Sequence, residues 1–503
     1  MPTEKRLTLV LRAVLLLGLG LLVVACAGAA TPVAPTAAPT EAAPPEPTSP
    51  PEPTGDPVRG GLLYDEWWAV PESEEGVGGN EGEEANEVKG PSTDQPLWST
   101  QSTNTRGGAD TWRCKECHGW DYKGADGAYG SGSHSTGFPG VFGVRDLPTT
   151  ELVAILKGST NPDHDFSDVM DDQDLTDLAL FITQALIDDA DFLNADGSSR
   201  GEAAQGEDRF DEVCTYCHGP QGNAINFDSL EEPEFLGHVA ADNPWEFLHK
   251  IRFGQPGWPM PSGIRNEWTD EDYANVLAYA QTFTTDPAVS GGGPLYDVWW
   301  EAVGVEAPGG DQPLWASQTT NPRSGADTWR CKECHGWDYQ GSEGAYGSGS
   351  HATGFPGVFT AATLAVNELT AWLTGGQNPD HDFSPYLNEA EIAALVSFMR
   401  EETFDSAPYI NPDGTVNGDP ARGKVKFEQT CAACHGIDGM EMNFGSTEEP
   451  EFVGTVAVDN PWEFLHKDAF GHPGVPMPAG LALGYTLEDL ANLLAYAQTL
   501  PTK

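Results

Sequence analysis

The sequence Cys114-Lys-Glu-Cys117-His118 sets the pattern on which the rest of the chain is organised. Two cysteines separated by two residues, with a histidine directly after the second, occur four times in 503 residues. The chain has only nine cysteines, so this pattern accounts for nearly all of them and does not arise by chance. The other three copies are Cys214-Thr-Tyr-Cys217-His218, Cys331-Lys-Glu-Cys334-His335 and Cys431-Ala-Ala-Cys434-His435.

Cys-x-x-Cys-His is the attachment sequence of c-type haem. Two thiols at this spacing reach the two vinyl groups on one edge of a porphyrin and form thioethers, and the following imidazole lies under the iron as its proximal ligand. Paired Cys-x-x-Cys units also build zinc sites, but zinc does not require a histidine after every second cysteine. We therefore expect four covalently bound haem c groups, with the following proximal ligands: His118, His218, His335 and His435.

The ninth cysteine, Cys26, ends an N-terminal segment that is typical of export. Lys5 and Arg6 precede an apolar run over residues 13–24, which is short for a membrane span of about 20 residues. Val23-Val24-Ala25-Cys26 resembles a bacterial lipobox, in which the cysteine is lipidated and becomes the new N-terminus. We expect residues 1–26 to be a signal peptide and the protein to be lipid-anchored to the outer face of the cytoplasmic membrane or the cell surface. An ordinary signal peptide and an uncleaved anchor are the alternatives.

A proline-rich linker is expected at residues 27–61. Residues 32–57 contain ten prolines, interleaved with Thr, Ala and Glu. Such a segment cannot bury a core and favours extended polyproline II, with a rise of roughly 3.1 Å per residue. It could hold the folded part up to about 80 Å from a membrane.

The remainder of the chain is duplicated. Residues 94–119 recur as residues 311–336 with 21 of 26 positions identical, and the same offset relates the first two haem motifs to the last two. Residues 63–68 recur as residues 295–300, but the first copy then carries 15 extra residues rich in Glu and Gly, which we expect to form a surface loop. Each copy holds two motifs in unlike subdomains.

We name the subdomains leading-type (motifs at Cys114 and Cys331) and trailing-type (motifs at Cys214 and Cys431). The expected architecture is all-α and loop-rich, with four small helical domains in two tandem dihaem repeats. The predicted boundaries are 62–188 and 291–405 for the leading-type domains, and 189–290 and 406–503 for the trailing-type domains.

The trailing-type domains share two further patterns. A glycine and an aromatic lie four residues apart just before the motif, and an amphipathic stretch with apolar residues at helical spacing ends each domain, as in residues 487–496. A methionine flanked by prolines precedes that stretch in both copies, at Met260 and Met477. Prolines restrict the conformations of such a loop.

These patterns resemble a class I cytochrome c domain. In that family a small residue and an aromatic on the first helix pack against an aromatic on the last helix, and a methionine before the last helix is the distal haem ligand. The resemblance implies that Met260 and Met477 are distal ligands rather than core filler. It assigns the helix-packing roles to Gly206, Phe210 and Tyr279 in the first copy and to Gly423, Phe427 and Tyr496 in the second.

The leading-type domains depart from this pattern, because their aromatic lies two residues before the motif. A final helix is still predicted, at residues 174–181 and 391–398. No methionine before it is common to both copies, since Met170 has Leu387 as its counterpart. His164 and His381, in a shared Asn-Pro-Asp-His-Asp-Phe segment, are therefore our predicted distal ligands.

Other histidines are shared by both copies. His134 and His351, on a Gly/Ser-rich loop, compete for the distal position, and the absence of any protein ligand is a further alternative. His249 and His466 lie on a predicted helix, where we expect a packed or propionate-bonding role.

The composition is strongly acidic, with a formal net charge of −52. Such a charge argues against nucleic acid as a partner and favours either a simple solvated surface or steering toward basic redox proteins. High contents of Gly (58) and Pro (40) predict short helices and long loops.

Electron transfer is the function that these features favour. Four haems with a sixth ligand each can pass electrons but leave no open iron for a substrate. We therefore expect an extracytoplasmic tetrahaem electron carrier rather than an enzyme. The alternatives are a duplicated dihaem oxidoreductase, with the leading-type haems as open catalytic sites, and a structural conductor in which chains stack haem to haem.

Overall fold

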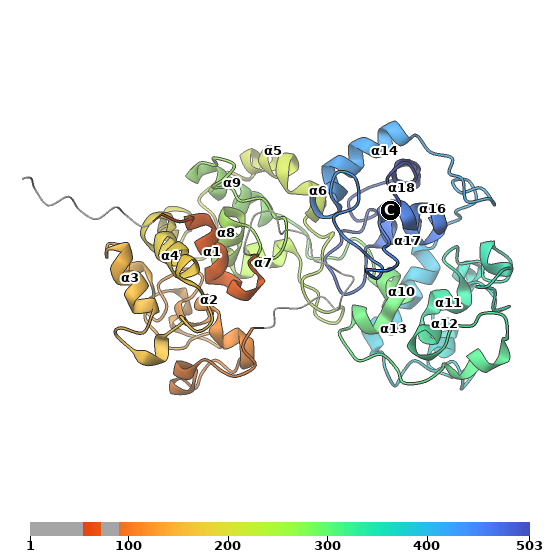
Figure 1. Ribbon diagram of the computed structural model, residues 1–503, viewed down its shortest axis with the longest axis horizontal. Helices are drawn as coiled ribbons and strands as arrows, with labels where there is room; N and C mark the ends of the chain where they lie inside the picture. Colours follow the sequence, from red (N-terminus) through yellow and green to blue (C-terminus); the bar gives the residue numbers. More distant parts are fainter. Residues whose placement is uncertain (1–53, 72–89) are drawn as a thin grey trace, which may run out of the picture. The chain divides into compact units, whose positions relative to one another are not determined.

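The computed structural model describes residues 54–71 and 90–503 (Figure 1). The predicted signal peptide, Cys26, nearly all of the linker and the insertion near residues 73–88 lie outside these ranges. The described residues belong to one compact unit. Within them the structure has helices and isolated β-bridges but no strand, so the all-α prediction is confirmed.

The helices follow the duplication. The first repeat contains α1 (Pro57–Glu66), α2 (Cys114–His118), α3 (Thr149–Leu156), α4 (Asp172–Leu180), α5 (Ala203–Val213), α6 (Thr215–His218), α7 (Leu236–Asp242), α8 (Pro244–Phe253) and α9 (Asp270–Ala280). The second repeat contains α10 (Gly292–Ala302), α11 (Cys331–His335), α12 (Val366–Leu373), α13 (Glu389–Ser397), α14 (Pro420–Lys426), α15 (Ala432–His435), α16 (Val453–Asp459), α17 (Pro461–Phe470) and α18 (Leu487–Ala497). None of the helices in the described ranges is both long and apolar enough to cross a membrane.

In both trailing-type segments the first and last helices cross at a glycine. Helix α5 contacts α9, and a Cβ atom on Gly206 would overlap the backbone carbonyl of Asn275. The aromatic one turn later, Phe210, packs against Tyr279 with ring centroids 5.6 Å apart. Helices α14 and α18 repeat the arrangement at Gly423. The predicted packing of small and aromatic residues is present in both copies.

The leading-type segments have the same crossing, but their first helix lies far from the haem motif in the sequence, although α1 contacts α2 in space. Helix α1 contacts α4, and a Cβ atom on Gly60 would overlap the carbonyl of Asp177. Tyr64, one turn later, packs against Phe181 with ring centroids 5.2 Å apart. More than forty residues of sequence separate α1 from α2. The Gly-x-x-x-aromatic spacing of Gly60 and Tyr64 equals that of the trailing type, and it would have been the sequence signal for this helix.

This helix corrects one predicted boundary. The linker was expected to extend to residue 61, but α1 begins at Pro57, and the side chain of Asp56 accepts a hydrogen bond from the Val58 amide at its N-terminus. Proline at the first position of a helix loses no hydrogen bond, because that amide has no partner within the helix. The last proline of the proline-rich stretch therefore starts a helix.

The predicted final helices are confirmed, and each begins with a capping box. In α9 the hydroxyl of Thr269 accepts a hydrogen bond from the Asp272 amide, while the Asp272 carboxylate accepts one from the Thr269 amide at 2.8 Å. Equivalent boxes begin α4, α13 and α18. These reciprocal bonds satisfy amides that a helix start leaves without partners, and they fix where the preceding loop ends.

We predict that Gly60→Ala destabilises the first leading-type domain by about 1–3 kcal/mol, because its methyl group must displace α4 from α1. The added Cβ would also lie 2.8 Å from Cβ of Phe181. Thermal unfolding followed by helical circular dichroism measures the effect. Gly143→Ala is the control, since its Cβ would meet nothing within 4 Å. Equal melting of the two variants would show that the crossing is not close-packed.

Candidate haem sites

Each of the four haem motifs forms a single helical turn that ends at a glycine. Gly119, Gly219, Gly336 and Gly436 follow the four histidines, and all have φ between 75° and 76°. Only glycine adopts this left-handed region freely, so the residue after each motif lets the chain turn away at once. The eight motif cysteines are partly buried, and none of them forms a disulfide.

In the leading-type sites, a hydrogen bond fixes the orientation of the proximal histidine. Nδ1 of His118 donates to the carbonyl of Pro139 at 2.6 Å, and His335 makes the same bond to Pro356. A carbonyl can only accept, so Nδ1 carries the proton and Nε2 keeps a lone pair for iron. Burial lowers the pKa of His118 to about 4, which keeps the ring neutral at pH 7.

The predicted distal histidines lie close to the predicted proximal ones. The ring centroids of His118 and His164 are 6.2 Å apart, and those of His335 and His381 are also 6.2 Å apart. Two metal–imidazole bonds of about 2 Å on opposite sides of one iron, each with its ring centre about 1.1 Å behind the nitrogen, separate the rings by about 6 Å. The spacing of these pairs fits an iron between them.

The loop that carries each predicted distal histidine is held by the segment Asp-Gln-Pro-Leu-Trp, which is identical in both copies. The Gln95 side chain donates to the carbonyl of Asp163 at 2.7 Å, directly before His164, and Gln312 makes the equivalent bond. Nδ1 of His381 donates to the carbonyl of Trp372 at 2.9 Å, which leaves its Nε2 free. This supporting role of the glutamines was not predicted from the sequence.

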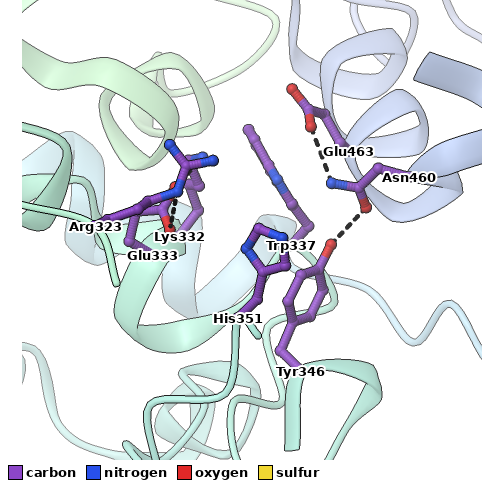
Figure 2. A pocket seen from close by; sticks show the side chains of 8 residues that line it. All are labelled: Arg323, Lys332, Glu333, Trp337, Tyr346, His351, Asn460 and Glu463. Carbon is purple, nitrogen blue, oxygen red and sulfur yellow. Dashed lines mark hydrogen bonds and ion pairs between the residues drawn. The ribbon is translucent and has the colours of Figure 1, made fainter. Parts of the chain in front are cut away.

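The competing histidines lie elsewhere. His134 and His351 are exposed, and the ring of His134 is 6.5 Å from that of Tyr129. Figure 2 shows His351 beside Tyr346 in a small polar pocket. Met170, the nearest methionine of the first leading-type domain, is buried in the apolar core. The remaining residues that line the pocket of Figure 2 are Arg323, Lys332, Glu333, Trp337, Asn460 and Glu463.

The two predicted distal methionines lie on loops in which the methionine backbone approaches a glycine closely. Gly254 has φ 98°, and a Cβ atom there would lie 2.6 Å from the carbonyl oxygen of Met260. Gly471 and Met477 repeat this close approach at 2.5 Å. Met260 is partly buried against the same apolar core as Cys214, the first cysteine of the second motif. The two residues therefore pack against the same trailing-type core.

The fourth site contains a histidine that sequence reasoning passed over. His472 lies in the loop of Met477, where the first copy has Gln255. Burial lowers the pKa of the proximal His435 to about 4, and the nearby His472 contributes to this shift. His472 is therefore a second nitrogen donor close to the fourth motif. Comparing the two copies position by position would have revealed it.

Comparisons with known proteins agree with this geometry. Residues 201–279, which include the second motif and Met260, match the family described as cytochrome c oxidase, cbb3-type, subunit III. This stretch of the chain is therefore a c-type cytochrome domain. A domain of this kind holds covalently attached haem c.

Two curated relatives are cytochrome c subunits of the cytochrome bc1 complex, from Mycobacterium bovis and Mycobacterium tuberculosis. Each is 24% identical to this cytochrome over 177 residues, which are 33% of this chain and 59% of the relative. The chain thus spans less than two thirds of the length of these relatives. A solved thiosulfate dehydrogenase (TsdBA) from Marichromatium purpuratum aligns with 80% of this chain and 89% of its own at 14% identity, with a TM-score of 0.18. A score of that size does not establish a shared fold.

Within each repeat of the cytochrome, a buried histidine joins the trailing-type helix to the leading-type core. His249 on α8 is 1% exposed, and its Nε2 donates to the carbonyl of Gly61 at 3.0 Å. Its Nδ1 therefore accepts the hydrogen bond from the Tyr122 hydroxyl at 2.9 Å. His466 makes the same two contacts in the second repeat. Both ring nitrogens are used, which favours the packed role over the propionate-bonding one.

A buried ionic group also connects α8 of the trailing-type domain to the leading-type core. Asp65 on α1 pairs with Arg113, directly before the first motif, at 2.5 Å and with Lys250 on α8 at 2.6 Å. Burial alone would raise the pKa of Asp65, but the two cations hold it well below its usual range. Breaking a buried pair of this kind by removing one partner is costly.

The second and fourth motifs of the cytochrome are neighbours. Helix α6 contacts the π-helical turn at Phe427–Cys431. Burial raises the pKa of Cys434 to about 11, and nearby Cys217 of the first repeat adds to this shift. A Cβ atom on Gly219 would lie 3.0 Å from the carbonyl oxygen of Ala482. The two trailing-type sites therefore meet, although they belong to different repeats.

We predict that Tyr122→Phe costs about 1–3 kcal/mol of stability, because it leaves the buried Nδ1 acceptor of His249 without a donor. Thermal or denaturant unfolding of the first repeat measures the loss. Tyr386→Phe is the control, since Tyr386 is 41% exposed and its hydroxyl can bond water. A loss no larger than that of the control would mean that the His249 bonds do not hold the two domains together.

Proposed function

We propose that this chain is an exported, membrane-anchored tetrahaem cytochrome c that transfers electrons between redox partners. The observation that carries the proposal is the 6.2 Å separation of the paired histidine rings in both leading-type sites. With a protein ligand on each side, such a site is built to pass electrons rather than to bind a substrate at the metal.

The proposed attachment residues are the eight cysteines of the four motifs. When bound, haem c supplies a one-electron couple between ferric and ferrous iron. The chain holds that group through two thioethers and presents one neutral imidazole, whose Nδ1–H bond in the leading-type sites fixes its direction. The proposed covalent attachment sites are Cys114, Cys117, Cys214, Cys217, Cys331, Cys334, Cys431 and Cys434, with His118, His218, His335 and His435 as proximal ligands.

The distal ligands divide the four sites into two kinds. We assign His164 and His381 to the leading-type sites and Met260 and Met477 to the trailing-type sites. A thioether raises the potential of a haem iron relative to a second imidazole. The proximal Nδ1–H bonds of the leading-type sites raise the basicity of the imidazole and lower the potential further. Each repeat thus pairs a lower-potential site with a higher-potential one.

The contact between the second and fourth motifs supports a route between the repeats. Electrons would cross from one trailing-type site to the other near Cys217 and Cys431, with a leading-type site at each end of the series. If the sites are numbered along the sequence, electrons would therefore pass through them in the order first, second, fourth, third.

Export and partners follow from the N-terminal sequence and the charge. Cys26 is the proposed lipidation site, and the proline-rich linker would separate the anchor from the folded part. The net charge of −52 favours partners with basic docking surfaces. The mycobacterial relatives are named as subunits of a cytochrome bc1 complex, which supports a redox partner in a respiratory chain.

The enzyme alternative requires an open iron face at the leading-type sites. In our assignment His164 and His381 occupy that face as ligands. The separation between the paired histidine rings is the same in both copies, which favours the electron carrier.

The stoichiometry tests this function directly. Mass spectrometry of the denatured mature protein should give four covalent haems per chain, one for each complete motif. A variant with Cys434→Ala and Cys431→Ala should retain three. Any other count for the wild type, or haem that acid–acetone extracts, contradicts the proposal.

We predict that His381→Ala converts one haem to high spin and leaves the other three low-spin, because one iron loses its distal nitrogen. Electron paramagnetic resonance of the ferric protein measures this change. His351→Ala is the matched control and should stay fully low-spin. The reverse outcome, with only the His351 variant turning high-spin, would move the ligand assignment to the Gly/Ser-rich loop.

We predict that Cys26→Ser releases the protein from membranes, because the lipid that holds it is lost. Membrane fractionation and the mass of the N-terminal peptide measure the change, and the unchanged haem spectrum is the control. A Cys26→Ser protein that stays in the membrane with an uncut N-terminus would instead support a plain anchor helix.

A further inference from the structure

The two trailing-type domains differ at one buried position close to the haem attachment residues. Helix α17 carries Asp468 where α8 carries Ile251. Ile251 lies in the apolar core against which Cys214 packs. Asp468 is 8% exposed, and its Oδ2 is buried without a hydrogen-bond partner among the residues that the structure describes. The second copy thus has a buried carboxyl group where the first copy has an aliphatic side chain.

The titratable groups around Asp468 come from three elements. Lys426 lies on α14, Cys431 lies at the fourth motif, and Tyr485 precedes α18. Lys426 also pairs with Asp489 at 3.5 Å and lies over the Tyr485 ring at 4.0 Å, so its charge is shared. Burial raises the pKa of Asp468 to about 8, and Lys426 only partly opposes the rise.

We propose that Asp468 is a proton-binding site coupled to the electron at the fourth haem site. The inference rests on the proposed attachment of haem at Cys431 and Cys434. When a redox partner protein delivers one electron to this site, Asp468 takes one proton from solvent and forms an O–H bond. When the electron leaves, the bond breaks and the proton returns to solvent.

The charge of the iron determines whether reduction raises or lowers the proton affinity of Asp468. A buried carboxylate without hydrogen-bond donors is costly, and a ferric iron nearby lowers that cost by its positive charge. An added electron removes that charge, so the carboxyl binds its proton more tightly in the ferrous state. At pH values between the pKa of Asp468 in the ferric state and its pKa in the ferrous state, the potential of the fourth site falls as pH rises. Outside that interval the potential is constant.

Redox titration of the full chain from about pH 5 to about pH 10 tests the inference, because this range spans the raised value for Asp468. In the wild type we expect reduction of one haem to raise the proton affinity of Asp468 at least tenfold. This corresponds to a pH-dependent shift of about 59 mV in the potential of that haem, for a one-electron couple. Asp468→Asn and Asp468→Ile should abolish the shift. His351→Ala, on an exposed loop of the second leading-type domain, should retain it.

The reciprocal variant Ile251→Asp should give a second pH-dependent haem. Redox-difference infrared spectra of the wild type give an independent measure: a protonated carboxyl band should appear on reduction and be absent in Asp468→Asn. A shift that persists in Asp468→Asn, or a wild type without a shift and without the band, overturns the inference. Four covalent haems in the same sample would show that such a result contradicts only the role of Asp468 and leaves the proposed function standing.

Discussion

The close crossing of a first and a last helix organises every quarter of this cytochrome. Glycine lets the two backbones touch, and an aromatic one turn later packs against a residue of the last helix or the turn that follows it. The loop before each last helix carries the predicted distal ligand, such as Met260 before α9 or His164 before α4. Because the crossing fixes the last helix, it also fixes where that loop can place its ligand.

Two kinds of site arise from this common arrangement. In the trailing type the first helix runs directly into the motif, and the predicted distal ligand is a methionine between prolines. In the leading type more than forty residues separate α1 from α2. The Asp-Gln-Pro-Leu-Trp sequence among them supports the loop of the histidine that we predict as distal ligand. The buried bonds of His249 and His466 then join one site of each kind into a repeat.

The sequence predicted most of the helical architecture, because the haem motifs, the duplication and the final helices are local patterns. It did not predict that α1 serves the leading-type domain, since the Gly-x-x-x-aromatic spacing of Gly60 and Tyr64 is the one feature that relates them to a motif more than forty residues later. The linker boundary failed for the same reason, because Pro57 is both the last of a proline run and the first residue of a helix. The role of Gln95 and the closeness of Cys217 to the fourth motif depend on tertiary packing, which no single segment encodes.

The central claim is that all four irons carry two protein ligands. Electron paramagnetic resonance of the unmodified ferric protein as isolated, with spins counted against the haem content, tests it most directly. The account predicts four low-spin signals per chain, two of the bis-histidine kind and two of the histidine–methionine kind. A high-spin signal that accounts for one or more haems per chain would contradict it and favour an open catalytic site.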